Sequence, residues 1–160
     1  MSLQNGAQLK YGPIKNEDSC VKVPVPMGAS EVIKAKSGRF VKNDGSGRME
    51  IAVAGSTRLE GWVELEEQTC SSTEGGTTGS LMPAAGALGV VFRIPVNSGT
   101  YVATMVGKTC DLSVASSIQG AALNLSTEDT LIIVDGDLIN NAWVDVMINP
   151  SKITGHTGVV

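Results

Sequence analysis

The only histidine of the chain lies in its C-terminal tail. His156 lies in the segment Thr-Gly-His-Thr-Gly near the C-terminus. A nucleophilic serine or cysteine needs a base beside it, and that base is usually histidine. Because residues 151–160 have the composition of an exposed C-terminal tail, we expect no catalytic triad.

The three cysteines, Cys20, Cys70 and Cys110, are far apart and include no Cys-x-x-Cys pair. A tetrahedral zinc site draws on closely spaced pairs of ligands, so this spacing does not predict one. The pattern fits reduced thiols in a protein made in the cytoplasm, and one disulfide with a spare thiol is the alternative.

Two short motifs imitate ligand-binding loops without their full pattern. Gly107-Lys108-Thr109 matches the end of a phosphate-binding loop, but that loop needs a glycine five residues before its last one, where this chain has Val102. Asp135-Gly136-Asp137, together with Asp145, offers the oxygen ligands that calcium takes, yet Asp and Gly in this order favour a turn. We therefore predict no cofactor and no metal site.

Paired catalytic carboxylates could come from one cluster of glutamates: Glu60, Glu64, Glu66 and Glu67. In a strand, three of them would share one face and alternate with Leu59, Val63 and Leu65. That alternation is typical of a solvated strand face rather than of an acid/base pair. Trp62 interrupts the polar face, so it would contact a partner or cover the end of the sheet. We predict that the protein is not an enzyme.

Composition narrows the possible partners. The 160 residues carry a net charge of −4 with a pI of about 4.9, which argues against a nucleic-acid partner. A local basic cluster is interpreted as solvated strand edges; it consists of Lys34, Lys36, Arg39, Lys42 and Arg48. No run approaches the ~18 apolar residues of a membrane helix, and the first residues are too polar for a secretory signal. We expect no membrane partner.

The elements that must position these side chains are short strands separated by glycine-containing turns. Between residues 38 and 66 the apolar runs 40–41, 49–54 and 62–65 alternate with turn signals, and we expect hairpins. Further on, 89–96 should pair with 100–106, and 130–134 with 142–148. Only 113–125 has any helical pattern, and its Ser, Val, Gly and Asn content makes a helix weak.

The predicted fold is therefore all-β or mostly β, a small β-barrel or sandwich built from hairpins with little helix. In the last expected strand, Trp143, Asp145 and Met147 would share one face, and we expect Trp143 to lie in the core. Whether the strands form one barrel, one sandwich or two small domains stays open.

The chain divides into three regions by composition. Residues 1–30 form an extended N-terminal arm, 31–150 a β-rich domain, and 151–160 the tail. The domain has two β units, 31–69 and 81–150, joined by a flexible loop at 70–80. In the arm, Val21, Val23 and Val25 alternate with Lys and Pro, and two prolines restrict this run to an edge strand or a free arm.

Several motifs in this arrangement point to one family. They are Lys36-Ser37-Gly38, Phe40-Val41, Asp44-Gly45-Ser46-Gly47-Arg48, Ala52-Val53-Ala54-Gly55 and Gly61-Trp62-Val63, followed by the strand-and-turn pattern of residues 100–150. The chain resembles the small β-rich capsid decoration (cement or auxiliary head) proteins of tailed bacteriophages. About two thirds of the sequence shares this resemblance; residues 1–30 and 70–80 do not.

The resemblance implies a structural virion protein that is synthesised in the host cytoplasm and located on the outer capsid surface. Its partners would be the major capsid protein, whose subunits it bridges, and copies of itself, as in a trimer at local three-fold positions. The residues expected to contact the capsid are in the arm: Leu9, Tyr11, Ile14, Val21, Val23 and Val25. An ordinary edge strand of the protein's own sheet is the alternative for this segment.

Two other classes of function stay open. A β-sandwich binding module for glycans or a host surface would use Trp62, Tyr101 or Trp143 to stack on a sugar, and would need these aromatics exposed in a groove. An enzyme with an unrecognised carboxylate site would need perturbed carboxylates gathered in a deep pocket.

Overall fold

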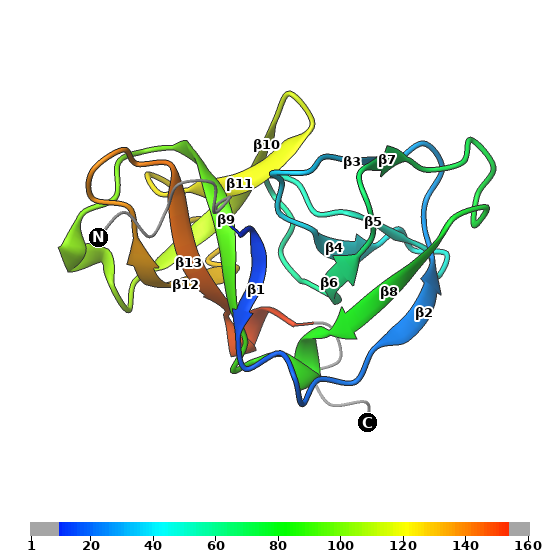
Figure 1. Ribbon diagram of the computed structural model, residues 1–160, viewed down its shortest axis with the longest axis horizontal. Helices are drawn as coiled ribbons and strands as arrows, with labels where there is room; N and C mark the ends of the chain where they lie inside the picture. Colours follow the sequence, from blue (N-terminus) through cyan, green and yellow to red (C-terminus); the bar gives the residue numbers. More distant parts are fainter. Residues whose placement is uncertain (1–9, 154–160) are drawn as a thin grey trace, which may run out of the picture.

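The computed structural model describes residues 10–153, and these residues form a mostly β protein, as the sequence predicted. The strands make two lobes that lie side by side (Figure 1). Lobe A contains β1 (Gly12–Lys15), β9 (Val91–Ser98), β10 (Thr109–Ala115), β11 (Ile118–Ala122), β12 (Leu131–Gly136) and β13 (Trp143–Ile148). Lobe B contains β2 (Val23–Pro26), β3 (Val32–Ile33), β4 (Phe40–Asn43), β5 (Met49–Ile51), β6 (Gly61–Glu64), β7 (Gln68–Thr69) and β8 (Thr78–Pro83).

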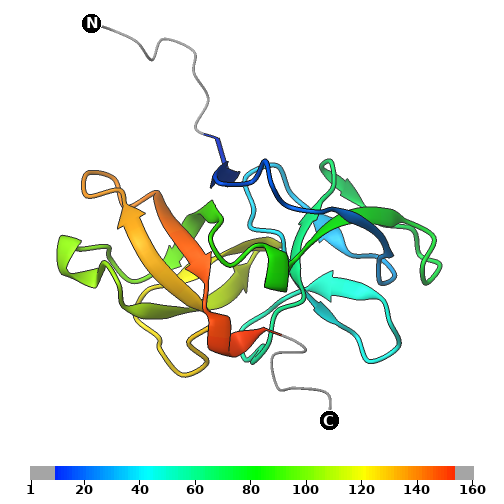
Figure 2. The same cartoon turned by 90° about the horizontal axis from the view of Figure 1, so that it is seen from below.

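Helical structure within residues 10–153 is limited to three short 3₁₀ segments, η1 (Ala84–Gly86), η2 (Ala103–Met105) and η3 (Pro150–Lys152). Figure 2 shows η1 between the lobes, where the chain leaves β8 and enters β9. The division between the two units therefore comes after Pro83 rather than in the segment 70–80. Across residues 10–153 no helix is long and apolar enough to cross a membrane.

Lobe A is a small closed barrel. Its sheet has the order β1-β9-β11-β10-β12-β13, and β13 also pairs with β9, so five strands form a ring. The β12–β13 hairpin confirms the predicted pairing of 130–134 with 142–148. The predicted pairing of 89–96 with 100–106 is wrong, because β9 pairs with β1, β11 and β13. The segment after β9 instead buries Tyr101 against Gly136. A Cβ atom added at Gly136 would lie only 2.6 Å from the ring of Tyr101.

The segment 113–125 is a hairpin of β10 and β11, not a helix. Ser116 and Ser117 form its turn, and both have positive φ angles, of 50° and 62°. Two consecutive residues with positive φ form the tight turn that matches the twist of paired strands. The weak helical pattern is therefore overridden by pairing within the sheet.

Lobe B has a five-stranded sheet in the order β2-β8-β6-β4-β5. Met27, directly after β2, bridges to Met49 of β5, which brings the two edges of this sheet together. The strands predicted at 40–41, 49–54 and 62–65 are confirmed as β4, β5 and β6. The loop expected at 70–80 is shorter, because β8 already begins at Thr78, and Cys70 is buried.

The central strands of lobe B are buried on both faces. Alternate residues point into lobe B, where Val41, Val63 and Leu81 join one hydrophobic cluster. Their neighbours point toward lobe A and join its core; they are Phe40, Trp62 and Met82. The sheet β4-β6-β8 therefore separates two cores, which is why Trp62 interrupts an otherwise regular polar–apolar alternation.

An aromatic cluster joins the lobes. The ring centroids of Phe40 and Phe92 lie 5.0 Å apart at a steep angle, and Trp62 stacks on Phe92 at 4.9 Å. Aromatic pairs at these separations stabilise a core beyond the effect of the area that they bury. Trp62 is 2% exposed, so it is a core residue and not an exposed partner contact.

Trp143, which we expected in the core, is only half-buried. It shares the outer face of β13 with Asp145, as predicted, while Val144, Val146 and Ile148 are fully buried inside the barrel. The guanidinium of Arg93 lies 3.7 Å from the centre of the Trp143 ring. The prediction failed because the inner face of β13 is filled by smaller aliphatic residues.

The N-terminal segment crosses from one lobe to the other as two edge strands. β1 pairs with β9 in lobe A, and β2 pairs with β8 in lobe B. Pro24 and Pro26 in β2 have no N–H group, which suits a position at the edge of a sheet. At the other end of the chain, Ile153 bridges to Leu59 and is buried, so the first residues after β13 pack on lobe B.

Candidate binding cleft between the lobes

The residues predicted to contact a capsid do not form one surface. Leu9 lies outside the described residues, as does His156. Tyr11 and Ile14 are half-buried beside or within β1 of lobe A. The three valines lie in or next to β2 of lobe B: Val21 is 71% exposed and Val23 is 37% exposed, whereas Val25 packs against the interior of the lobe.

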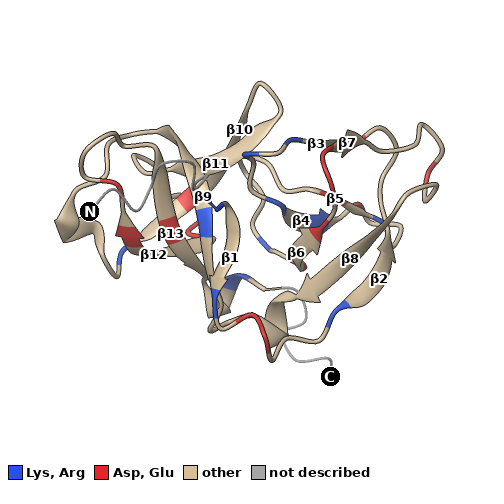
Figure 3. Ribbon diagram, in the orientation of Figure 1, with Lys and Arg blue, Asp and Glu red and all other residues tan. Residues whose placement is uncertain are grey.

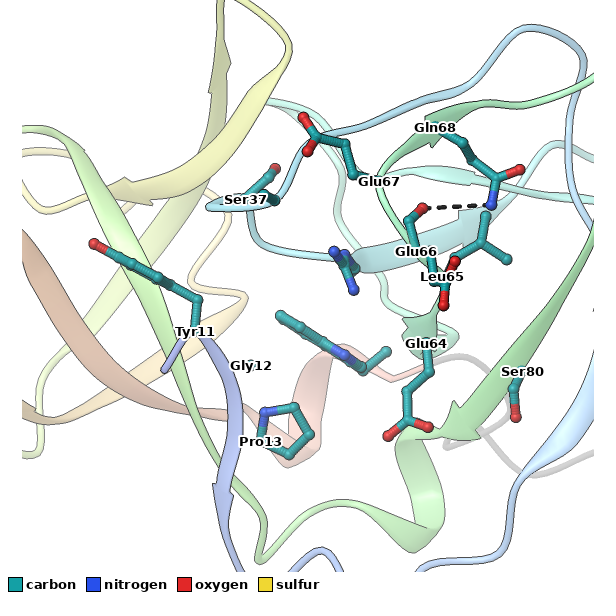
Figure 4. Close-up of a pocket in the computed structure, with 13 residues that line it drawn as sticks. Tyr11, Gly12, Pro13, Ser37, Glu64, Leu65, Glu66, Glu67, Gln68 and Ser80 are labelled. Carbon is teal, nitrogen blue, oxygen red and sulfur yellow. Dashed lines mark hydrogen bonds between the residues drawn. The ribbon is translucent and has the colours of Figure 1, made fainter. Parts of the chain in front are cut away.

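A cleft of about 850 Å³ separates the two lobes (Figure 4). One wall is Gly12 and Pro13 of β1, and the opposite wall is the segment 64–68 that connects β6 to β7. Trp62 and Arg39 line the space between the walls. The ring of Tyr11 points away from the cleft, over lobe A, so this residue contributes mainly its backbone (Figure 4).

Gly12 brings the two walls together at the base of the cleft. Its φ angle is 105°, a conformation that residues with a Cβ atom rarely adopt. A Cβ atom at this position would also lie 3.4 Å from Cζ2 of Trp62. The close approach of β1 to Trp62 therefore depends on glycine.

Arg39 contributes a buried polar atom to the cleft that has no partner within the described residues. Its Nε is buried and donates no hydrogen bond within residues 10–153. Burial lowers the pKa of Arg39, and the negative charges of Glu64 and Glu67 oppose this effect. Because an arginine stays protonated at neutral pH even so, the cleft contains a half-buried positive charge with an unused donor.

The wall opposite β1 is acidic. Glu64 forms an ion pair with Lys22 at 2.9 Å, whereas Glu66 and Glu67 are exposed and form no ion pair within the described part of the chain. Elsewhere acidic and basic residues are interspersed over both lobes (Figure 3). In the basic cluster noted in the sequence, Lys42 pairs with Glu50 at 2.8 Å, and Arg48 pairs with Asp44 at 2.8 Å and Glu74 at 2.9 Å.

In the same wall, three backbone N–H groups have no hydrogen-bond partner within the described residues. Within residues 10–153, the N–H groups of Leu65, Glu66 and Glu67 donate no hydrogen bond, because the segment lies between the ends of β6 and β7. The carbonyl of Glu66 accepts a long bond of 3.4 Å from the side chain of Gln68. This wall of the cleft therefore contains a segment of main chain that belongs to no strand and has N–H groups without a partner in residues 10–153.

Gln119 connects the two lobes, a role that the sequence analysis did not predict. This residue of β11 is fully buried, and its side-chain Oε1 accepts a bond of 2.9 Å from the N–H of Phe40. Its Nε2 donates to the carbonyls of Phe40 at 2.8 Å and Ala52 at 2.7 Å. A lone glutamine in a strand pattern carries no local signal of this contact, because the partners are at least 67 residues away.

Two of the three aspartates considered as calcium ligands, Asp137 and Asp145, have structural roles. Asp137 accepts bonds from the N–H groups of Ile139, Asn140 and Ala142, and fixes the turn between β12 and β13. Asp145 accepts two bonds from Arg93, at 2.7 and 2.8 Å. No group of three or more His, Cys, Asp or Glu side chains in residues 10–153 is arranged to hold a metal ion.

The aromatic side chains do not form a platform for sugars. Trp62 and Tyr101 are only 2% and 4% exposed, and Arg93 covers one face of Trp143. A stacking site requires an open ring face in a groove. This arrangement does not favour the interpretation of the protein as a glycan-binding module.

Comparison of the chain with protein-family models, curated proteins and solved structures found no match.

Proposed function

We propose that the protein is a structural component of a tailed-phage virion, which decorates the outer surface of the capsid and bridges neighbouring subunits of the major capsid protein. The observation that carries this proposal is a pair of exposed aliphatic sites, one on each lobe. A protein that bridges two subunits needs two separate contact surfaces, and exposed apolar side chains are the common anchors of such surfaces.

The first site is the turn between β12 and β13 in lobe A. Leu138 is 65% exposed and Ile139 is 90% exposed. The carboxylate of Asp137 holds this turn through three backbone N–H groups, so the two side chains are presented on a defined loop. Pre-organised side chains lose little conformational freedom on binding, which favours their use as anchors.

The second site is the approach to β2 in lobe B, with Val21 and Val23 exposed. We infer that these side chains dock on a partner surface and that β2 does not receive an added strand. Pro24 and Pro26 leave its outer edge without donors at two positions, which disfavours strand addition. Two weak contacts to adjacent subunits, repeated over many copies on a capsid, give tight overall attachment by avidity.

Co-sedimentation with undecorated capsids of the phage that encodes the chain tests this proposal. We expect saturable binding at a fixed ratio to the major capsid protein, and the ratio would indicate the lattice position, including a trimer at local three-fold positions. The variants Leu138→Asp with Ile139→Asp, and Val21→Asp with Val23→Asp, should each weaken binding by at least about tenfold.

Val114→Asp is the matched control. Val114 is 39% exposed on the β10–β11 hairpin, away from both sites, so its substitution should leave capsid binding unchanged. Absence of binding by the unmodified protein would refute the capsid role. Equal losses in all three variants would refute the assignment of the two sites.

A further inference from the structure

We propose that the cleft between the lobes binds an extended, positively charged peptide segment of a partner protein. This inference goes beyond the capsid role, because it concerns a second surface and does not depend on which protein carries the segment. It follows from the backbone, the charges and the unused donor of the cleft.

The main chain of the wall formed by residues 64–68 favours a peptide over a compact ligand. The N–H groups of Leu65, Glu66 and Glu67 have no partner within residues 10–153. Peptides commonly bind through main-chain hydrogen bonds to groups that lack a partner, and neighbouring pockets then select their side chains. The opposite wall, Gly12 and Pro13, has small side chains that leave room for a backbone.

The charge of the cleft selects a basic segment. Three glutamates, Glu64, Glu66 and Glu67, line the cleft together with one arginine, and of the three only Glu64 has an ion-pair partner within the described residues. A free anion would be repelled by the two unpaired glutamates, whereas a Lys or Arg side chain would be attracted to them. Charge complementarity therefore identifies the ligand as cationic.

Arg39 indicates that the ligand also carries a hydrogen-bond acceptor. Its buried Nε has a proton to donate and no acceptor within the described residues. A buried donor that lacks an acceptor costs free energy, so a ligand that supplies one gains affinity. A backbone carbonyl is such an acceptor and carries no net charge, so a cationic peptide satisfies Arg39 without introducing an anion beside the glutamates.

Fluorescence anisotropy tests the proposal with a short labelled peptide in which lysine alternates with valine. A glutamate–valine peptide of the same length and a lysine–valine peptide with N-methylated amides are the comparison probes. We expect saturable binding of the lysine peptide, with at least about tenfold weaker binding of both comparison probes.

Protein variants separate the proposed contacts from general attraction to a negatively charged protein. Glu66→Lys and Glu67→Lys should each weaken binding of the lysine peptide by about tenfold, while Glu128→Lys, which makes the same charge change outside the cleft, should leave it within about twofold. Arg39→Met should weaken binding by about fivefold, because the donor is lost. Electrostatics alone would give the opposite result, since removal of a positive charge would tighten binding of a cation.

Three results would overturn the proposal: equal affinity for the lysine and glutamate peptides, equal effects of Glu67→Lys and Glu128→Lys, or tighter binding by Arg39→Met. Each variant is checked by circular dichroism so that loss of folding is not mistaken for loss of binding. Peptide binding without capsid binding would refute only the capsid role, and capsid binding without peptide binding would refute only the assignment of the cleft.

Discussion

The replacement of Gln119 by alanine is expected to be among the most damaging single changes in lobe A, although the residue is polar and takes no part in the proposed contacts. The side chain is fully buried and makes three hydrogen bonds to the backbone of lobe B. Its removal would leave a buried donor, the N–H of Phe40, and a buried acceptor, the carbonyl of Ala52.

The magnitude follows from these two groups. The carbonyl of Phe40 would keep one partner, because it also accepts a bond of 2.9 Å from the N–H of Ala52. Each buried group left without a partner costs about 1–3 kcal/mol. With the cavity added, we expect Gln119→Ala to lower the free energy of unfolding by about 3–5 kcal/mol.

Urea unfolding measured by tryptophan fluorescence is a suitable assay, because Trp62 lies in the aromatic cluster between the lobes. Gln68→Ala is the matched control, since Gln68 is exposed and makes one long hydrogen bond. It should change the free energy of unfolding by less than about 0.5 kcal/mol. A loss of less than about 1 kcal/mol in Gln119→Ala would show that the lobes do not depend on this contact.

Three further predictions follow from packing and from thiol chemistry. Trp62→Ala should lower the free energy of unfolding in urea by about 3–5 kcal/mol. Trp143→Ala should lower it by only about 1–2 kcal/mol, because Trp143 is half-exposed on the outer face of β13. Similar losses in the two variants would contradict this placement. Gly38→Ala should cost about 1–3 kcal/mol, since its Cβ would lie 2.6 Å from the amide oxygen that binds Phe40, and unchanged stability would contradict this packing. Burial raises the pKa of the Cys110 thiol to about 12. The thiolate is the reactive form of cysteine, and this higher pKa leaves about one Cys110 thiol in ten thousand ionised at pH 8. A maleimide should therefore label the partly exposed Cys20 and leave Cys110 unmodified until urea unfolds the protein. Rapid labelling of Cys110 in the native protein would contradict its burial.

Much of the strand pattern was predictable because it is encoded locally. The strands at β4, β5 and β6 and the β12–β13 hairpin came from apolar runs that end at Gly, Asn and Asp, residues that favour turns. The alternation in β13 also placed Val144 and Asp145 on opposite faces correctly. These features depend on residues that are neighbours in the chain, so they can be predicted from the sequence.

The errors arose where burial depends on segments that are distant in the chain. Alternation shows that a strand has two faces, but not which of them another segment will cover. Trp62 is a core residue because lobe A covers the outer face of β6, whereas Trp143 is half-exposed on a face of β13 that is covered only in part, since Asp145 on the same face is buried. The expected pairing of 89–96 with 100–106 was wrong for the same reason, because β9 pairs with strands that are distant in the chain, β1, β11 and β13.

The candidate site also combines features that are encoded locally with features that depend on distant segments. Residues 60–67 were recognised in the sequence as a cluster of carboxylates, but nothing near them indicated that Gly12 would come to face them or that Arg39 would lie between. The short strands and tight turns follow from local sequence, because those preferences are properties of single residues and their neighbours. The assembly of these strands into two lobes around a common aromatic cluster, with a charged cleft between them, depends on tertiary contacts, because burial and electrostatic pairing are set by segments far apart in the chain.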